Sequence, residues 1–186
     1  MKRFAAVAAL FVGISFLADE AQAQQTLPLS FEGRAGVAIP TGDLGDEFDP
    51  GFAFGANIAW HFTPMFGVYG GYSQAAFGTG DDSSVRSQGF DLGAHVDLPS
   101  PMLAPWLRGG LVFKEMHASR GAASLTSDTG TGFEVGGGIA FPIADMISLT
   151  PGLRYTSFPV TYQEFGVDQG DNASYLTLDV GVRVRL

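Results

Sequence analysis

Tyr175-Leu-Thr-Leu-Asp-Val-Gly-Val-Arg-Val-Arg-Leu186, at the end of the sequence, alternates strictly between two faces. One face carries only leucine and valine, and the other carries Tyr175, Thr177, Asp179, Gly181, Arg183 and Arg185. A repeat of two residues indicates a β-strand, because successive side chains point to opposite faces. The run is about twice the usual length of a globular strand. A strand of about ten residues with one apolar side is typical of a tilted membrane-spanning strand.

The same alternation recurs in earlier segments, which we predict as strands over residues 30–39, 52–62, 66–77, 90–98, 107–114, 133–141 and 147–156. The connections between strands alternate in length: 40–51, 78–87, 117–130 and 158–173 are long, and 63–65, 99–105 and 142–146 are short. An even number of antiparallel strands with short periplasmic turns and long outer loops is the pattern of outer-membrane barrels. The sequence therefore predicts an all-β fold, an eight-stranded antiparallel up-and-down transmembrane β-barrel.

Residues 1–23 have the features of a secretory signal peptide. Lys2 and Arg3 precede an apolar run over residues 4–18, and Ala21-Gln-Ala23 supplies a cleavage site of small residues. We expect export, cleavage near Ala23 and a single mature domain over residues 24–186, integral to the bacterial outer membrane. The alternative is an uncleaved membrane anchor. The chain has no cysteine, which excludes a disulfide framework, and its net charge of -9 argues against a nucleic-acid partner.

The signal peptide, the eight alternating strands and loops such as Pro40-Thr-Gly-Asp43 before Gly51-Phe-Ala-Phe-Gly55 carry a resemblance. The whole mature chain resembles the small outer-membrane β-barrel family of OmpX and the transmembrane domain of OmpA. That resemblance implies a monomer with outer-membrane lipid and lipopolysaccharide as partners, and with the barrel-assembly machinery as a partner during biogenesis. One departure is the last residue, Leu186, where the family usually ends in an aromatic side chain that this machinery reads.

The polar faces of the strands are expected to line the interior. A soluble β-sandwich or lipocalin-like barrel would turn the apolar faces inward instead, but the strands are long and the charged faces are rich in glycine and alanine, as a narrow bore requires. Acids and bases nearly balance there, as a buried ionic network demands. The predicted network is Glu32, Arg34, Asp91, Asp97, Arg108, Lys114, Glu134, Arg154, Asp179 and Arg183. We interpret it as a salt-bridged plug, and the alternative is an ion path.

Aromatic residues gather near the ends of the predicted strands, where barrels carry girdles at the membrane interfaces. The girdle at the short-turn end is predicted to consist of Trp60, Phe62, Phe66, Trp106 and Phe141. Phe77 is one of the aromatics expected at the long-loop end.

No cofactor and no metal site are expected from the sequence. Acidic residues are concentrated in the long loops, where divalent cations can bridge them to lipopolysaccharide phosphates, but their spacing matches no calcium loop. His61 and His95 share the interior face on separate strands. We expect them to be ordinary hydrogen-bonded histidines, because no Cys/His cluster accompanies them.

The sequence also contains one weak match to a catalytic motif. His117-Ala-Ser119 resembles the His-x-Ser motif of outer-membrane lipid A deacylases, and Glu134 would complete a nucleophile, base and acid. Arg120-Gly121 follows where that family's motif continues differently, and Glu134 falls on the interior face. The sequence therefore favours a non-enzymatic structural or surface-interaction role, with a lipid A deacylase-like hydrolase and a small-solute channel as alternatives.

Overall fold

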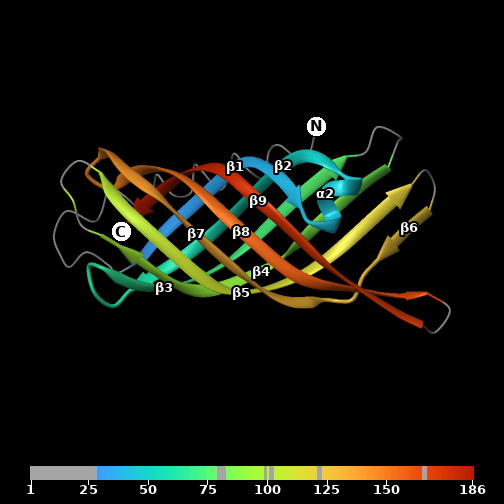
Figure 1. Cartoon of the computed structure of the whole chain (residues 1–186). Helices are drawn as coiled ribbons and strands as arrows, with labels where there is room; N and C mark the ends of the chain where they lie inside the picture. Colours follow the sequence, from blue (N-terminus) through green and yellow to red (C-terminus); the bar gives the residue numbers. More distant parts are fainter. Residues whose placement is uncertain (1–28, 79–82, 99, 101–102, 121–122, 165–166) are drawn as a thin grey trace, which may run out of the picture.

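The computed structural model (Figure 1) describes residues 29–78, 83–98, 100, 103–120, 123–164 and 167–186. The predicted signal peptide lies outside the described residues. The barrel strands are β1 (Leu29–Thr41), β2 (Asp49–His61), β3 (Phe66–Gly78), β4 (Ser83–Asp97), β5 (Ala104–Arg120), β7 (Gly130–Ala144), β8 (Ile147–Glu164) and β9 (Val167–Arg185). A short strand, β6 (Ala123–Thr126), and one helical turn, α2 (Asp43–Glu47), complete the described elements.

Every barrel strand is antiparallel to both of its neighbours, in the order β4-β3-β2-β1-β9-β8-β7-β5, and β4 also pairs with β5. The sheet therefore closes on itself, and the predicted eight-stranded up-and-down barrel is confirmed. The alternating stretch at the end of the chain is β9, which pairs with β1 from Ser30↔Arg185 to Thr41↔Ser174. None of the helices in the described residues is long and apolar enough to cross a membrane.

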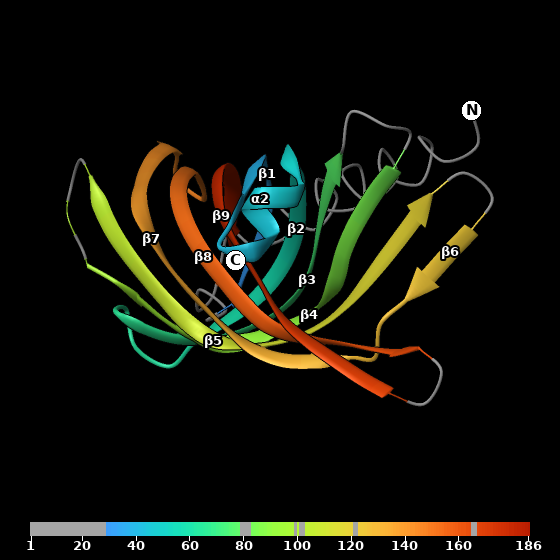
Figure 2. The ribbon, with the colours of Figure 1, turned by 45° about the vertical axis from the view of Figure 1, so that its right-hand side comes forward.

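The two ends of the barrel differ. The short connections β2–β3, β4–β5 and β7–β8 gather at one end, here called the short-turn end, and the chain finishes there (Figure 1). At the opposite, long-loop end, β6 pairs with residues 117–120 of β5, and β8 and β9 continue as a hairpin. Figure 2 shows both hairpins projecting at that end.

Much of what the sequence predicted as long loops is β-structure. β4 begins at Ser83, β5 runs to Arg120, and the β8–β9 hairpin occupies most of the predicted loop 158–173. The prediction was wrong because it relied on apolar alternation, which is needed only where a strand faces lipid. Backbone pairing continues beyond the lipid, where both faces of a strand can be polar.

The apolar faces point outward and the polar faces point inward. Phe52 is 79% exposed and Phe90 66%, whereas Glu32 and Asp91 are each 2% exposed. A soluble barrel would show the reverse, because its apolar side chains would fill the centre. The apolar outer surface is suited to lipid, and the closed sheet satisfies the backbone hydrogen bonds that lipid cannot.

Candidate functional site

The inner half of the lumen, toward the short-turn end, holds an ionic network centred on Glu32 of β1. Its carboxylate accepts hydrogen bonds from Arg108 Nη2 at 2.9 Å and from Arg183 Nε at 3.0 Å. Arg154, Asn57 and Thr150 each place a donor 3.4 Å away. One acid therefore ties together β1, β2, β5, β8 and β9, because alternation turns a polar side chain of each strand toward the same axis.

Further ion pairs extend this network from Glu32 toward both ends of the barrel. Asp91 lies 2.8 Å from Lys114 Nζ and 3.3 Å from Arg34 Nη2, and Asp179 pairs with Arg154. Asp97 lies 2.8 Å from Arg183 Nη1, toward the short-turn end. The structure thus joins all the predicted network residues in ion pairs except Glu134, for which no pair is found among the described residues.

Glu134 lies on β7 and is buried, and its Oε1 has no hydrogen-bond partner within the described part of the chain. It lines an internal cavity together with Arg34, Arg154 and Asp179. The centre of a water molecule can move within only about 20 Å³ there, which is room for one or two waters. The cavity is polar and large enough for water, which a buried carboxylate oxygen without a protein partner requires.

Trp106 corrects the predicted girdle. Its side chain is 1% exposed and lies inside the lumen, with the guanidinium groups of Arg108 and Arg154 at 5.0 and 5.5 Å from the ring. A Cβ added at Gly138 would lie 2.7 Å from the indole, so this glycine makes room for the ring. The arginines gain a cation–π partner in a site that excludes water. Trp106 is two residues before Arg108, which was predicted to face the interior, and alternate residues of a strand share one face. The sequence prediction overlooked this signal.

The other members of the predicted girdle lie on the outer surface. Trp60, Phe62, Phe66 and Phe141 are all exposed. The ring centroids of Trp60 and Phe62 are 6.1 Å apart, and those of Phe62 and Phe66 are 6.5 Å apart. Trp60, Phe62 and Phe66 thus form an aromatic edge beside the β2–β3 turn, and Phe141 lies apart from them on β7.

The outer half of the lumen, toward the long-loop end, holds a buried apolar cluster, which the sequence did not predict. Phe77, Phe158 and Tyr175 are at most 4% exposed and pack with Leu44 of α2 in one buried cluster. The rings of Phe77 and Tyr175 meet edge to face at 5.4 Å. Phe77 was expected among the outward aromatics, but it has the inward parity of β3. The lumen is therefore closed by charge pairs in its inner half and by hydrophobic packing in its outer half.

The hypothetical catalytic set is not assembled. The two ring nitrogens of His117 face Thr126 Oγ1 at 2.9 Å and Gln88 Nε2 at 3.0 Å, and Ser119 Oγ instead contacts Ser84 Oγ at 3.1 Å. Glu134 is buried in the lumen, whereas His117 and Ser119 lie on the outward side of β5, so the wall of the barrel separates them. Among the described residues Ser119 has no base as a hydrogen-bond partner, and the carboxylate beside His117 is the partly exposed Glu115, at 3.4 Å, so the two form no charge-relay arrangement.

His117 instead borders a groove on the outward side of β4, β5 and β6. The groove has a volume of about 350 Å³ and is lined by polar side chains, among them Arg86, Gln88 and Ser119. It lies beyond the lipid-facing Phe90 and Phe113 along the same two strands, toward the long-loop end. A groove that follows the apolar residues of these strands is expected at the level of lipid head groups.

A closed antiparallel sheet with a lipid-facing apolar surface and a filled polar interior defines an integral membrane β-barrel. A family model of the outer membrane protein beta-barrel domain matches residues 5–185, and the chain belongs to this family. The protein is accordingly an integral component of the bacterial outer membrane. No curated protein matches the chain.

Solved barrels share the fold at low sequence identity. Neisserial surface protein A superposes with a TM-score of 0.70 at 18% identity, covering 88% of this chain and 100% of that one. The N-terminal β-barrel domain of OprF from Pseudomonas aeruginosa gives 0.56 at 12% identity, covering 87% and 100%. Ail, the attachment invasion locus protein of Yersinia pestis, gives 0.52 at 14% identity, covering 83% and 97%. These similarities establish the architecture.

Proposed function

We propose that this protein is a non-enzymatic, non-conducting outer-membrane barrel whose role is carried by its surfaces. The filled lumen is the observation that supports this proposal. A solute crossing the barrel would have to displace the ion pairs around Glu32, the indole of Trp106 and the apolar cluster around Phe158. Eight-stranded barrels have just enough interior for side chains to fill, and here both halves of the interior are packed.

Conductance tests the closed lumen. Purified protein reconstituted in planar bilayers should give no current steps, while a general porin inserted by the same route establishes the sensitivity of the assay. The variant Trp106→Ala/Phe158→Ala removes one large side chain from each half of the lumen and serves as a matched control, in which we expect brief openings. Stable currents from the wild-type protein that scale with salt concentration would overturn the proposal in favour of the small-solute channel.

Lipopolysaccharide is the surface partner that we propose. Arg86 supplies a positive charge in the outward groove at the level of lipid phosphates, and one basic side chain near an anionic surface contributes about 1 kcal/mol. Arg86→Gln should therefore weaken lipopolysaccharide binding about fivefold. Arg185→Gln, at the short-turn end, is the matched control and should bind like wild type. Equal binding by both variants would remove the groove from this role.

Two further parts of the proposal concern export and chemistry. The protein is exported, inserted by the barrel-assembly machinery and monomeric in the membrane. Cleavage after Ala23 predicts a mature chain that begins at Gln24, which N-terminal sequencing of outer-membrane fractions can check. A non-enzymatic role predicts that mass spectrometry finds the same lipid A in cells with and without the protein. Loss of an acyl chain that depends on Ser119 would restore the hydrolase alternative.

A further inference from the structure

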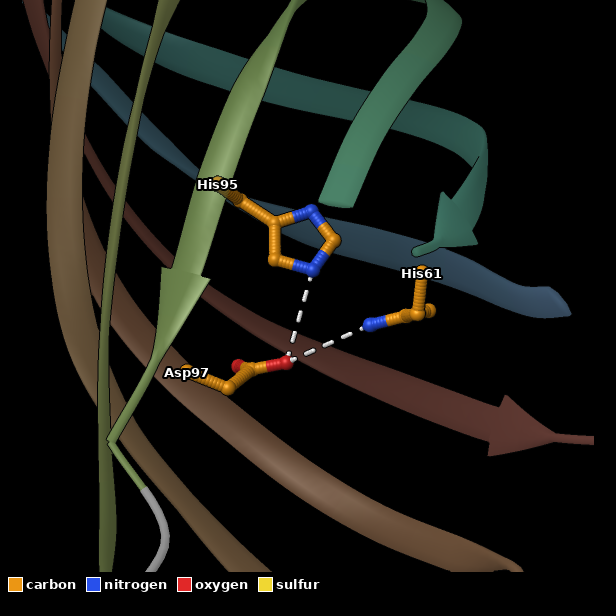
Figure 3. A group of neighbouring side chains, drawn as sticks. All are labelled: His61, His95 and Asp97. Atoms are coloured by element: carbon orange, nitrogen blue, oxygen red, sulfur yellow. Dashed lines mark ion pairs between the residues drawn. The ribbon is translucent and has the colours of Figure 1, made fainter. Parts of the chain in front are cut away.

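A cluster of two imidazoles and one carboxylate lies at the short-turn end of the lumen, apart from the centre of the ionic network. Figure 3 shows His61 at the end of β2 and His95 and Asp97 at the end of β4, all directed toward one point. Asp97 Oδ2 is 3.4 Å from His95 Nε2 and 3.9 Å from His61 Nδ1. One ligand atom from each residue falls within 4.8 Å of the other two.

The register of three neighbouring strands creates this cluster. Gly67 of β3 is paired with His61 on one side and with His95 on the other, so the two histidines flank a residue that has no side chain. A Cβ at Gly67 would lie 2.9 Å from His95 Cε1 and 3.1 Å from its Nε2. The imidazoles can therefore close over β3, with ring centroids 4.6 Å apart. Asp97, two residues after His95, points to the same face.

The hydrogen bonding of the rings leaves the facing nitrogens available. His95 is 3% exposed, and its Nε2 has no hydrogen-bond partner among the described residues. His61 Nε2 lies 3.0 Å from Ser30 Oγ, which can accept a proton carried on Nε2; in that tautomer the lone pair of Nδ1 faces Asp97. Histidine ligands of metals usually use the second nitrogen in this way.

From this geometry we propose that the cluster binds one divalent transition metal ion of the zinc type, with His61 Nδ1, His95 Nε2 and an oxygen of Asp97 as ligands. Bonds of about 2.0–2.1 Å in a tetrahedral site place neighbouring ligand atoms about 3.3 Å apart. The separation of 3.4 Å from Asp97 to His95 already fits, and that of 3.9 Å to His61 needs a shift of about half an ångström. The two imidazole nitrogens lie within 4.8 Å of each other and would move together as the ion binds. Two imidazoles with one carboxylate suit zinc, cobalt or nickel, whereas calcium and magnesium take oxygen ligands.

Arginines compete with the metal for Asp97. Arg183 holds Oδ1 at 2.8 Å and also pairs with Glu32, so its charge is shared between two acids. Arg185 holds Oδ2 at 2.9 Å, but its side chain is 52% exposed and can turn into water. The metal therefore replaces Arg185 on Oδ2 and links β2 to β4 across β3.

Isothermal titration of zinc into tag-free, chelator-treated full-length barrel in detergent tests this proposal, together with the visible absorption of bound cobalt. We expect one ion per barrel and a cobalt spectrum of low coordination number. Both His61→Gln and His95→Gln should weaken binding at least about a hundredfold, and Ser30→Ala about tenfold, because outer-shell partners of ligands have effects of 10–100-fold. Arg185→Gln should bind zinc more tightly, because it removes the competitor.

His117→Gln is the matched control, since His117 is the remaining histidine of the chain and is distant from the cluster in the fold. It should bind zinc like wild type. Folding of each variant is checked by the mobility difference between unboiled and boiled samples. Three results would overturn the proposal: no stoichiometric binding by wild type, full binding by the two folded cluster variants, or loss of binding in His117→Gln. Arg185→Gln keeps the proposal testable if a histidine variant does not fold.

Discussion

Glu32→Gln is expected to destabilise the barrel more than any exposed substitution, because it removes the central negative charge of the network. At 2.9 Å, the attraction between Glu32 and Arg108 amounts to about 6 kcal/mol at an effective dielectric constant of about 20. Glutamine retains an acceptor oxygen and recovers part of this energy. What remains is the cost of leaving Arg108 without a carboxylate partner, and breaking one side of a buried pair costs about 3–5 kcal/mol.

The free energy of unfolding can be measured by urea titration of barrels folded in lipid vesicles, followed by the gel mobility of unboiled samples. Asp128→Asn is the control, because Asp128 is exposed, and it should change the free energy by less than about 0.5 kcal/mol. Glu32→Gln/Arg108→Gln should be less destabilised than the sum of its single variants, since removing both partners leaves less unpaired charge. If the free energy of unfolding of Glu32→Gln lies within about 0.5 kcal/mol of the wild-type value, the network does not hold the strands together.

Three other predictions follow from packing and orientation. Gly152→Ala should cost about 1–3 kcal/mol of unfolding free energy, because a Cβ there meets the ring of Trp106, whereas Gly33→Ala, with nothing within 4 Å, should be neutral by the same titration. Brominated acyl chains should quench Trp60 fluorescence in the Trp106→Phe variant, and should leave Trp106 unquenched when Trp60 is replaced; equal quenching would contradict the orientation. Phe158→Ala should cost about 3–5 kcal/mol, since it leaves a cavity in the outer apolar cluster.

The sequence predicted the strand faces well and the positions along the strands less well. The alternation of the strands puts Glu32 and Arg183 on the face opposite to Leu178, and the length of the apolar faces then indicates that Leu178 faces lipid. Trp106 and Phe77 were misplaced because they were assigned by their level near a strand end, where a girdle is expected, while their parity pointed inward. The extent of β5 and the β8–β9 hairpin was missed because polar strands beyond the lipid carry no apolar alternation.

The sequence could not predict which side chains meet across the lumen. Which arginine reaches Glu32 depends on how far each strand is shifted against the next, and a slip of one residue would turn every side chain to the other face. The same holds for His61, Gly67 and His95, which form one row only in the observed registers of β2, β3 and β4. No spacing along the chain relates these residues, so the sequence alone suggested two ordinary interior histidines.

Strand alternation along the chain was enough to predict a closed outer-membrane barrel, because long strands with one wholly apolar face indicate lipid on one side and a shared interior on the other. The filling of that interior became visible in the folded barrel: charge pairs around Glu32, the indole of Trp106 between arginines and glycines, an apolar cluster in the outer half, and a histidine–aspartate cluster at the short-turn end. The physical reason is that side-chain direction is a local property of a strand, whereas contacts across a lumen depend on strand register and closure of the sheet.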